Sequence, residues 1–272
     1  MIFLGGFGGY GLIGIHDVAL HFGGIKAVDG ISLNIKKGSI TGLIGPNGAG
    51  KTTLFNIIAG LYSPSAGHIT LDGKDTVGLK PHQLFPEGLL RTFQIAHEFS
   101  SLTVRENLMM VPDKQSGESL INALFRRDRV RAEEQQVRHK ADEVIDFLNL
   151  NHLADEQAGT LSGGQKKLLE LGRTMMVDAK IVLLDEVGAG VNRTLLNEIG
   201  DAIIKLNKER DYTFCMIEHD MDFISRLCDP VIVMAEGRLL AEGTAEEVKS
   251  NEEVIEAYLG TGLKNKPGAH IP

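Results

Sequence analysis

Gly45-Pro46-Asn47-Gly48-Ala49-Gly50-Lys51-Thr52 fits the pattern G-x-x-x-x-G-K-[ST]. This segment, called the phosphate loop below, follows a predicted strand at Ile40 to Ile44 and precedes a predicted helix. Glycines let backbone N–H groups converge on a β-phosphate, and the N-terminus of the helix favours negative charge. Lys51 can reach the β- and γ-phosphate oxygens, and Thr52 can ligate magnesium. The segment therefore predicts phosphate binding; a glycine-rich turn with an incidental lysine is the alternative, which the strand-loop-helix order opposes.

A second anionic site is predicted where the apolar run Ile181 to Leu184 ends in Asp185 and Glu186. Such a run is typical of a strand that is buried on both faces of a parallel sheet. Asp185 would hold magnesium, and Glu186, which projects differently, would orient and activate the attacking water. An isolated acidic pair at a strand end is more often a solvated terminus, but the phosphate loop favours the catalytic interpretation.

The segment Leu161-Ser162-Gly163-Gly164-Gln165 needs a separate explanation, because nucleotide binding in the same half of the molecule does not require it. Ser162 and Gln165 form a Ser-x-x-Gln cap, and the two glycines permit close backbone approach. The helix that follows directs its positive end at whatever lies beyond. On its own, this segment would be interpreted as an ordinary capped helix.

The phosphate loop, Gln94, Leu161 to Gln165, Asp185-Glu186 and His219 follow one another in the order of ABC transporter ATPases, which the chain resembles from Ile15 to Gly260. The resemblance implies an α/β fold with a P-loop NTPase (RecA-like) core, an antiparallel β subdomain and an inserted α-helical subdomain. It also implies a head-to-tail dimer that binds two ATP molecules. Each ATP would lie between the phosphate loop of one subunit and the Ser-Gly-Gly segment of the other.

Further roles are carried over from this resemblance. Ser162 and Gly164 would touch the γ-phosphate of the opposite site, and His219 would contact the γ-phosphate. Gln94 would sense the nucleotide and the transporter. Phe22 would stack on adenine, a role that suits a π face. Without the other motifs, Phe22 would be interpreted as a core residue, and His219 as an ordinary surface or core residue. The expected nucleotide contacts are Phe22, Gly45, Pro46, Asn47, Gly48, Ala49, Gly50, Lys51, Thr52, Thr53, Ser162, Gly163, Gly164 and Gln165. The expected catalytic residues are Glu186, His219, Gln94 and Lys51, and the expected magnesium ligands are Thr52, Gln94 and Asp185.

Two positions depart from the family pattern. Val187 stands where the family usually has proline, and Asn192 stands where it usually has aspartate. Neither change removes an expected magnesium ligand or the expected base. Both bear on the rate of hydrolysis and on signalling between the two ATP sites.

The domain organisation follows from alternating patterns along the chain. We expect a flexible N-terminal extension over 1–14, an ABC ATPase domain over 15–260 and a tail over 261–272. A helical subdomain over 95–160 is inserted in the ATPase domain; it contains a capping-box pair, Thr103 and Glu106, and a long charged helix from about Val130 to Leu148. Strand and helix patterns alternate again after Ile181, which predicts a parallel α/β arrangement.

Composition excludes several functional classes. The 272 residues carry a formal net charge of -8, which opposes a nucleic-acid partner because affinity for phosphate chains depends on clustered Lys and Arg. Two cysteines without a CxxC pair indicate neither a disulfide scaffold nor a Cys-ligated metal. The uncharged stretch from Met1 to Ile15 is too short to span a bilayer.

Several segments resemble the ATPases of branched-chain amino acid importers: Arg91 to Gln94, Thr103 to Leu108, Ala189 to Asn192 and Val254 to Gly260. The implied partners are transmembrane permease subunits, a second identical or related ATPase subunit and, indirectly, a solute-binding protein. The implied location is the cytoplasmic face of the inner or plasma membrane. The alternatives are the ATPase of another ABC system, for urea, amides or lipopolysaccharide, and a soluble ABC ATPase of DNA repair or translation. A small-molecule phosphotransferase would share the phosphate loop but would not need Leu161 to Gln165.

Overall fold

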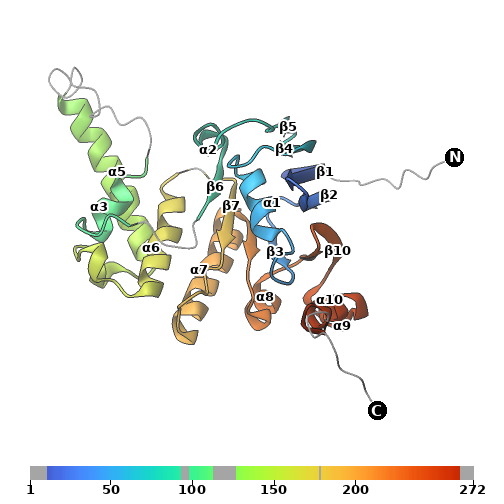
Figure 1. Cartoon of the computed structure of the whole chain (residues 1–272). Helices are drawn as coiled ribbons and strands as arrows, with labels where there is room; N and C mark the ends of the chain where they lie inside the picture. Colours follow the sequence, from blue (N-terminus) through green and yellow to red (C-terminus); the bar gives the residue numbers. More distant parts are fainter. Residues whose placement is uncertain (1–10, 93–97, 113–126, 178, 264–272) are drawn as a thin grey trace, which may run out of the picture. The chain divides into compact units, whose positions relative to one another are not determined.

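The computed structural model describes residues 11–92, 98–112, 127–177 and 179–263 (Figure 1). The chain divides into two compact units. Unit 1 consists of Met1–Arg91, Lys180–Glu186 and Ile204–Pro272, and unit 2 consists of Thr92–Ala179 and Val187–Ile203. The chain therefore passes from unit 1 to unit 2 twice before it returns to unit 1 for its C-terminal part.

A six-stranded sheet forms the centre of unit 1, with the strand order β10-β9-β3-β8-β7-β6. Its strands are β3 (Ile40–Ile44), β6 (Leu89–Arg91), β7 (Ile181–Asp185), β8 (Thr213–Ile217), β9 (Val231–Ala235) and β10 (Arg238–Gly243). All pairs of neighbouring strands in this sheet are parallel except the pair β9 and β10, which forms an antiparallel hairpin. The strands β3, β7 and β8 are buried along their whole length, as continuous apolar runs in a parallel sheet should be. Their carboxyl ends meet at one edge of the sheet, where ligands bind in open α/β folds.

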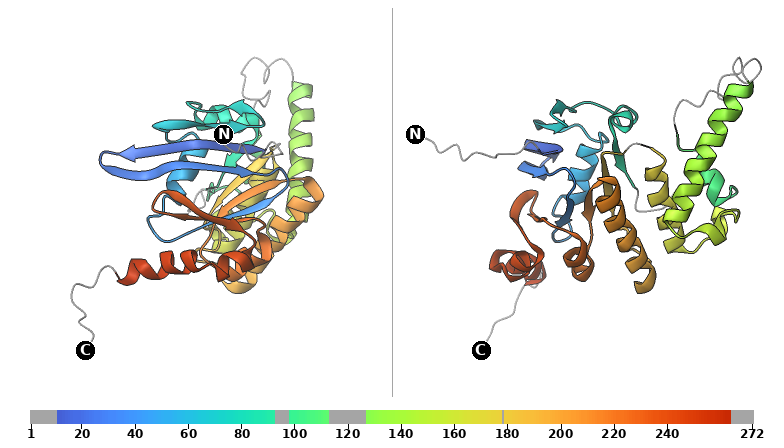
Figure 2. Two further views of the ribbon diagram at one scale, coloured as in Figure 1. Left: turned by 90° about the vertical axis from the view of Figure 1, so that its right-hand side faces the viewer. Right: turned by 180° about the vertical axis from the view of Figure 1, so that it is seen from behind.

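A second, antiparallel sheet in unit 1 has the strand order β2-β1-β4-β5. Its strands are β1 (Ile13–Phe22), β2 (Ile25–Ile35), β4 (Ala66–Leu71) and β5 (Lys74–Asp75). Figure 2 shows β1 and β2 as a long ribbon of paired strands. A turn at Asp72-Gly73, a dipeptide typical of hairpins, connects β4 to β5, with both residues at positive φ.

Regular secondary structure extends slightly beyond both expected ends of the ATPase domain. Strand β1 begins at Ile13, so Ile13 and Gly14 belong to the sheet, and Leu12 and Ile13 are buried. The many glycines near the N-terminus conceal this strand, since Gly14 pairs with Asn34 but contributes no side chain to the pattern. At the other end, the last helix continues to Leu263, beyond the expected domain end at residue 260. Glycine weakens a helix by about 1 kcal/mol but does not prevent one.

Helices pack around these sheets. Helix α1 (Lys51–Ile58) buries Leu54, Phe55, Ile57 and Ile58, which join side chains of both sheets in one apolar core. Full burial of a side chain of this size contributes about 1.5–3 kcal/mol. The other helices of unit 1 are α2 (Pro81–Leu84), α8 (Met221–Leu227), α9 (Ala245–Ser250) and α10 (Glu252–Leu263). Asn251 caps the start of α10, because its side chain accepts hydrogen bonds from the backbone N–H groups of Glu253 and Val254.

Helices make up most of the described part of unit 2. They are α3 (Val104–Met109), α5 (Arg127–Phe147), α6 (Gly163–Met175) and the first part of α7 (Arg193–Arg210). The predicted capping box of Thr103 and Glu106 starts α3. A Cβ atom at Gly172 of α6 would lie 2.8 Å from Leu148 and 3.1 Å from Val144, so glycine lets these segments approach closely.

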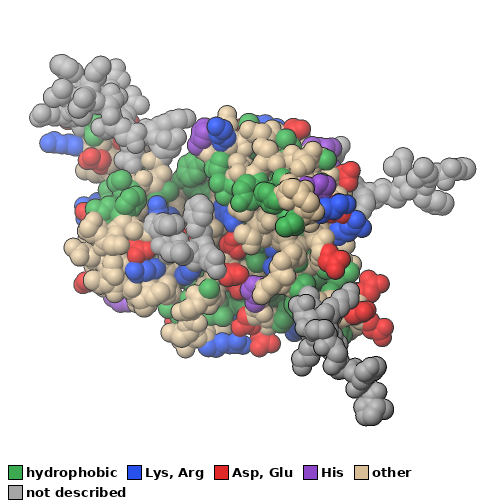
Figure 3. Space-filling view, in the orientation of Figure 1, with side chains coloured by type: hydrophobic (Ala, Val, Ile, Leu, Met, Phe, Trp, Pro, Cys, Tyr) green, Lys and Arg blue, Asp and Glu red, His purple; other side chains and the backbone are tan. Residues whose placement is uncertain are grey.

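The surface carries the negative net charge unevenly. Acidic side chains gather over the region of α9 and α10 in Figure 3, where Glu246, Glu247, Glu252 and Glu253 occupy the first turns of the two helices. Negative charge at a helix N-terminus complements the helix dipole, usually by about 0.3–1 kcal/mol. Within the ranges that the structure describes, we find no helix with the length and apolar character of a membrane-spanning segment.

Candidate nucleotide-binding site

The phosphate loop connects β3 to α1, as the sequence predicts. Its backbone requires glycine at two positions. Gly45 has a φ of 147°, and a Cβ atom there would lie 2.0 Å from the carbonyl oxygen of Met234 in β9. Gly50, which precedes α1, has a φ of 95°, and its Cβ would lie 2.2 Å from the carbonyl oxygen of Ala27 in β2. The loop is therefore packed closely against two strands, and it leads directly into the N-terminus of α1.

The side chain of Lys51 folds back onto the phosphate loop. Its Nζ atom donates hydrogen bonds to the carbonyl oxygens of Gly45, at 2.7 Å, and Pro46, at 3.0 Å. The side chain is buried, and this burial lowers the pKa of Lys51, while the charges of Glu186 and Asp185 act in the opposite direction. The ammonium group thus lies within the loop, and phosphate oxygens could replace its carbonyl partners.

Polar side chains next to Lys51 suit magnesium. Thr52 is exposed in the first turn of α1, and Asp185 ends β7 in the same unit. A hydroxyl and a carboxylate are hard oxygen ligands, and Mg²⁺ binds through one or two such groups together with substrate phosphates. The donor set therefore fits the ion. The third expected ligand, Gln94, lies outside the described residues.

The sequence did not reveal that Asp185 forms a buried ion pair with Arg91. The Nη2 atom of Arg91, in β6, lies 2.8 Å from Oδ2 of Asp185. A second guanidinium nitrogen, Nη1, donates to the side-chain oxygen of Asn56 in α1, and the guanidinium lies over the ring of Phe55. Arg91 thereby fixes one oxygen of the carboxylate. The only signal in the sequence is a charged residue after the apolar pair Leu89-Leu90, which does not identify the partner.

Glu186 and His219 meet beyond the ends of two adjacent strands. Glu186 follows β7 and has a φ of 50°, in the left-handed region that residues other than glycine seldom adopt. Its N–H donates to the carbonyl oxygen of Ile217 in β8, at 2.9 Å. The bend turns the carboxylate of Glu186 towards His219, whose Nε2 lies 3.0 Å from Oε1. A carboxylate beside an imidazole at this edge could accept a proton from water.

Two aromatic side chains of unit 1, Phe22 and Tyr62, are in contact. Phe22, at the end of β1, is half exposed and meets Tyr62 edge-on, with ring centroids 5.6 Å apart. Phe22 is therefore not a core residue, and its ring is accessible for stacking on a base. No motif in the sequence marks Tyr62. Tyr258 of α10 also reaches the phosphate loop: partial burial raises its pKa, and a hydrogen bond with the backbone of Gly45 acts in the opposite direction.

Ser162 to Gln165 form the predicted cap at the start of α6, in unit 2. The Ser162 N–H donates to the Gln165 side chain, at 2.9 Å, and the Gln165 N–H donates to the Ser162 hydroxyl, at 3.4 Å. A Cβ atom at Gly164 would lie 2.0 Å from Leu195 of α7, so this glycine is required for packing. Among the residues that the structure describes, a Cβ at Gly163 would meet one atom within 4 Å, the Gly190 carbonyl oxygen at 3.8 Å.

The two departures from the family pattern have clear local environments. Val187 is buried. The side chain of Asn192 accepts a hydrogen bond from the N–H of Leu195, at 3.0 Å, and so caps the start of α7. Asn and Asp are similarly good N-caps, which explains why the exchange preserves the helix start while it removes a charge.

Comparison with known proteins shows which families and relatives the chain resembles. Residues 28–189 match the family described as ABC transporter, and residues 238–264 match a family described as Branched-chain amino acid ATP-binding cassette transporter. The probable branched-chain amino acid transport ATP-binding protein LivG of Methanocaldococcus jannaschii is 40% identical over 248 residues, which are 90% of this chain and 95% of the relative. The high-affinity branched-chain amino acid transport ATP-binding protein BraF of Pseudomonas aeruginosa is 36% identical over 249 residues, 92% of this chain and 98% of the relative.

Solved structures agree with these relatives. A crystal structure of the ADP conformation of an ATP-binding cassette from an ABC transporter has a TM-score of 0.78 and 37% identity, and covers 92% of this chain and 98% of that one. The expected P-loop NTPase fold is therefore confirmed. The chain belongs to the ABC transporter family, in which it is an ATP-binding subunit that couples ATP hydrolysis to transport.

Proposed function

We propose that this chain hydrolyses ATP to drive a branched-chain amino acid importer. The observation that carries the proposal is the grouping in unit 1 of the phosphate loop with Asp185 and Glu186, at the end of β7, and with His219. The solute class is supported by the names of the relatives and by the match of the C-terminal segment at 238–264.

Each side chain has a task in this proposal. Lys51 leaves the carbonyl oxygens of Gly45 and Pro46 and binds the β- and γ-phosphates instead. Thr52 and Asp185, with Gln94, hold Mg²⁺, which neutralises phosphate charge when it is bound. Glu186 accepts a proton from the attacking water, and His219 orients the carboxylate and reaches the γ-phosphate. The exposed ring of Phe22 stacks on adenine.

A second ATPase subunit, identical or related, completes the site. Ser162 caps the N-terminus of α6, and there is space around Gly163, the first residue of the helix. The N-terminus of a helix favours an anion such as a phosphate group. ATP would therefore be bound between the phosphate loop of one subunit and Ser162 to Gln165 of the other. Closure of this dimer would supply the force that acts on the permease.

The remaining partners follow from the family. ABC transporter ATPases act on membrane permease subunits, so this chain would lie at the cytoplasmic face of the membrane as a peripheral subunit. A solute-binding protein would deliver the amino acid to the permease. A helical insert near residues 95–160 would provide the surface for the permease, which remains a prediction from the sequence.

Reconstitution tests the proposal. The chain is purified with its permease and solute-binding protein, and ATP turnover in proteoliposomes is measured with leucine, isoleucine, valine, urea or no solute. We expect the three aliphatic amino acids to stimulate turnover and urea to leave it at the basal rate. Stimulation by urea alone would assign the chain to a different ABC importer. Co-purification with nucleic acid or ribosomes and not with permease would overturn the transport role.

A further inference from the structure

The turn of the β9–β10 hairpin contacts the phosphate loop. Gly237, in this turn, donates its N–H to the carbonyl oxygen of Ala49, at 3.1 Å. The carbonyl oxygen of Gly237 in turn accepts from the N–H of Asp29 in β2, at 2.8 Å. Two backbone hydrogen bonds therefore connect β2 to the loop through a single residue of the hairpin.

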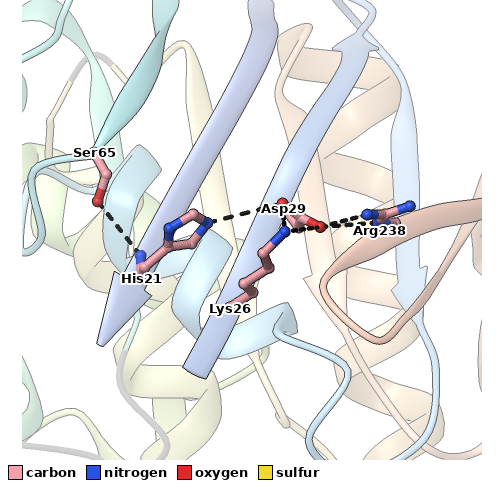
Figure 4. A network of polar contacts seen from close by, with 5 residues as sticks. All are labelled: His21, Lys26, Asp29, Ser65 and Arg238. Atoms are coloured by element: carbon pink, nitrogen blue, oxygen red, sulfur yellow. Dashed lines mark hydrogen bonds and ion pairs between the residues drawn. The ribbon is translucent and has the colours of Figure 1, made fainter. Parts of the chain in front are cut away.

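Side chains fasten the same turn to β2. Arg238, the first residue of β10, donates through Nε and Nη2 to Oδ2 of Asp29, at 3.0 and 2.6 Å. Lys26 donates to Asp29 at 3.3 Å, and Nε2 of His21 lies 3.8 Å from its other oxygen. Figure 4 shows the side chains of His21, Lys26 and Arg238 converging on Asp29 from β1, β2 and β10. The hydrogen bond from Arg238 is the main cause of the lowered pKa of Asp29.

Little space remains between these three segments. The carbonyl oxygen of Ala27 would lie 2.2 Å from a Cβ at Gly50 and 3.1 Å from a Cβ at Gly237. Strand β2, the hairpin turn and the end of the phosphate loop are therefore in direct contact. A displacement of the turn would move the Ala49 carbonyl, and with it the peptide groups that lead into α1.

The exposure of the Arg238–Asp29 ion pair limits its contribution to global stability. The side chain of Arg238 is 67% exposed and that of Asp29 is 17% exposed. Exposed pairs add little to global stability, because water screens their charges. The effect of the pair is therefore mainly geometric, because it joins β2 to Arg238, the residue that directly follows Gly237.

We propose that Asp29 and Arg238 are positioning residues of the nucleotide site, which hold the β9–β10 turn against Ala49 and so fix the phosphate loop in its binding conformation. The inference rests on the proposed function, since it concerns the affinity of this loop for nucleotide phosphates. Neither residue touches the nucleotide; both act through Gly237.

Hydrogen exchange of the nucleotide-free full chain tests the contact directly. In Arg238→Met, we expect the amides of the phosphate loop to exchange about 3- to 10-fold faster than in the wild type, as for the loss of a contact in a hydrogen-bonded network. The matched control is Lys74→Met, which breaks another exposed ion pair of unit 1, with Glu87 at 3.0 Å. It should leave exchange in the loop unchanged. Equal exchange in both variants would overturn the inference, whether or not the protein binds nucleotide.

Nucleotide affinity supplies the second measurement. We expect Arg238→Met to raise the Kd for ADP about 3- to 10-fold and to leave the Kd for AMP nearly unchanged, because only ADP offers a β-phosphate to the loop. Arg238→Lys, which keeps the charge but not the two-nitrogen contact, should have an intermediate effect and also serves if the Met variant does not fold. Equal losses for ADP and AMP would contradict a role in positioning the loop. A wild type that binds neither nucleotide would refute the proposed function instead.

Discussion

The imidazole of His219 lies 3.0 Å from the carboxylate of Glu186, although the two residues are 33 positions apart in the chain. Parallel pairing of β7 with β8 brings their carboxyl ends together, and the left-handed backbone of Glu186 turns its side chain to the histidine. A strained backbone at a residue other than glycine persists where its surroundings enforce it, and such residues cluster at active sites. The structure therefore supports a specific division of labour between Asp185, which remains in line with the strand, and Glu186, which does not.

Replacement of the candidate base should separate hydrolysis from binding. In Glu186→Gln, we expect ATP turnover to fall by about 10²- to 10⁴-fold, the usual contribution of a general base, while ATP affinity is retained. The amide keeps the hydrogen-bonding shape but does not accept the proton from water. Steady-state turnover and size-exclusion chromatography with ATP measure the two effects, and a stable ATP-bound dimer should appear. Glu209→Gln, at an exposed position of α7, is the control, and unchanged turnover in Glu186→Gln would remove this residue from its role.

Local signals in the sequence explain why some of the site could be predicted. The phosphate loop, the caps at Thr103 and Ser162 and the strand β7 depend on residues that are near neighbours in the chain, so pattern and chemistry coincide. The contacts that were missed depend on the tertiary fold. Arg91 donates a hydrogen bond to Asp185, 94 positions away in the chain, and Arg238 donates one to Asp29, 209 positions away. No periodicity or spacing in a single sequence encodes such pairs.

The buried pair of Arg91 and Asp185 should dominate the stability of this edge of the sheet. Both side chains are only 9% exposed, so Arg91→Met leaves a carboxylate without its partner in a dry environment. We expect the free energy of unfolding to fall by about 3–5 kcal/mol. Urea unfolding of the nucleotide-free protein measures it. Lys180→Met, which breaks an exposed pair with Asp72 at 3.0 Å, should leave the free energy of unfolding nearly unchanged, and equal losses in the two variants would contradict the argument.

Two glycines of the phosphate loop provide a matched test of packing. Gly48 and Gly50 both have a positive φ, at 80° and 95°, but only Gly50 faces a neighbouring backbone oxygen, at 2.2 Å from its would-be Cβ. We expect Gly48→Ala to cost about 1–2 kcal/mol of unfolding free energy, because the left-handed region disfavours a Cβ atom. Gly50→Ala should cost about 1–3 kcal/mol more, since the loop must also move away from Ala27. Similar midpoints of urea unfolding for the two variants would show that the contact with β2 is not rigid.

Both cysteines should be inert in the folded protein. Cys215 and Cys228 are buried, and desolvation is the main cause of the raised pKa of each thiol, to about 12 for Cys228 and further in the same direction for Cys215. At pH 8, only about one Cys228 thiol in 10⁴ would be the reactive thiolate, compared with roughly a quarter of free thiols. Labelling by maleimide, followed by mass spectrometry, should therefore be slow in the native chain and rapid in urea. Lys74→Cys, at an exposed site, should react at the rate of a free thiol. Reaction of either native cysteine at that rate would show that the β3–β8 region opens far more often than its complete burial implies.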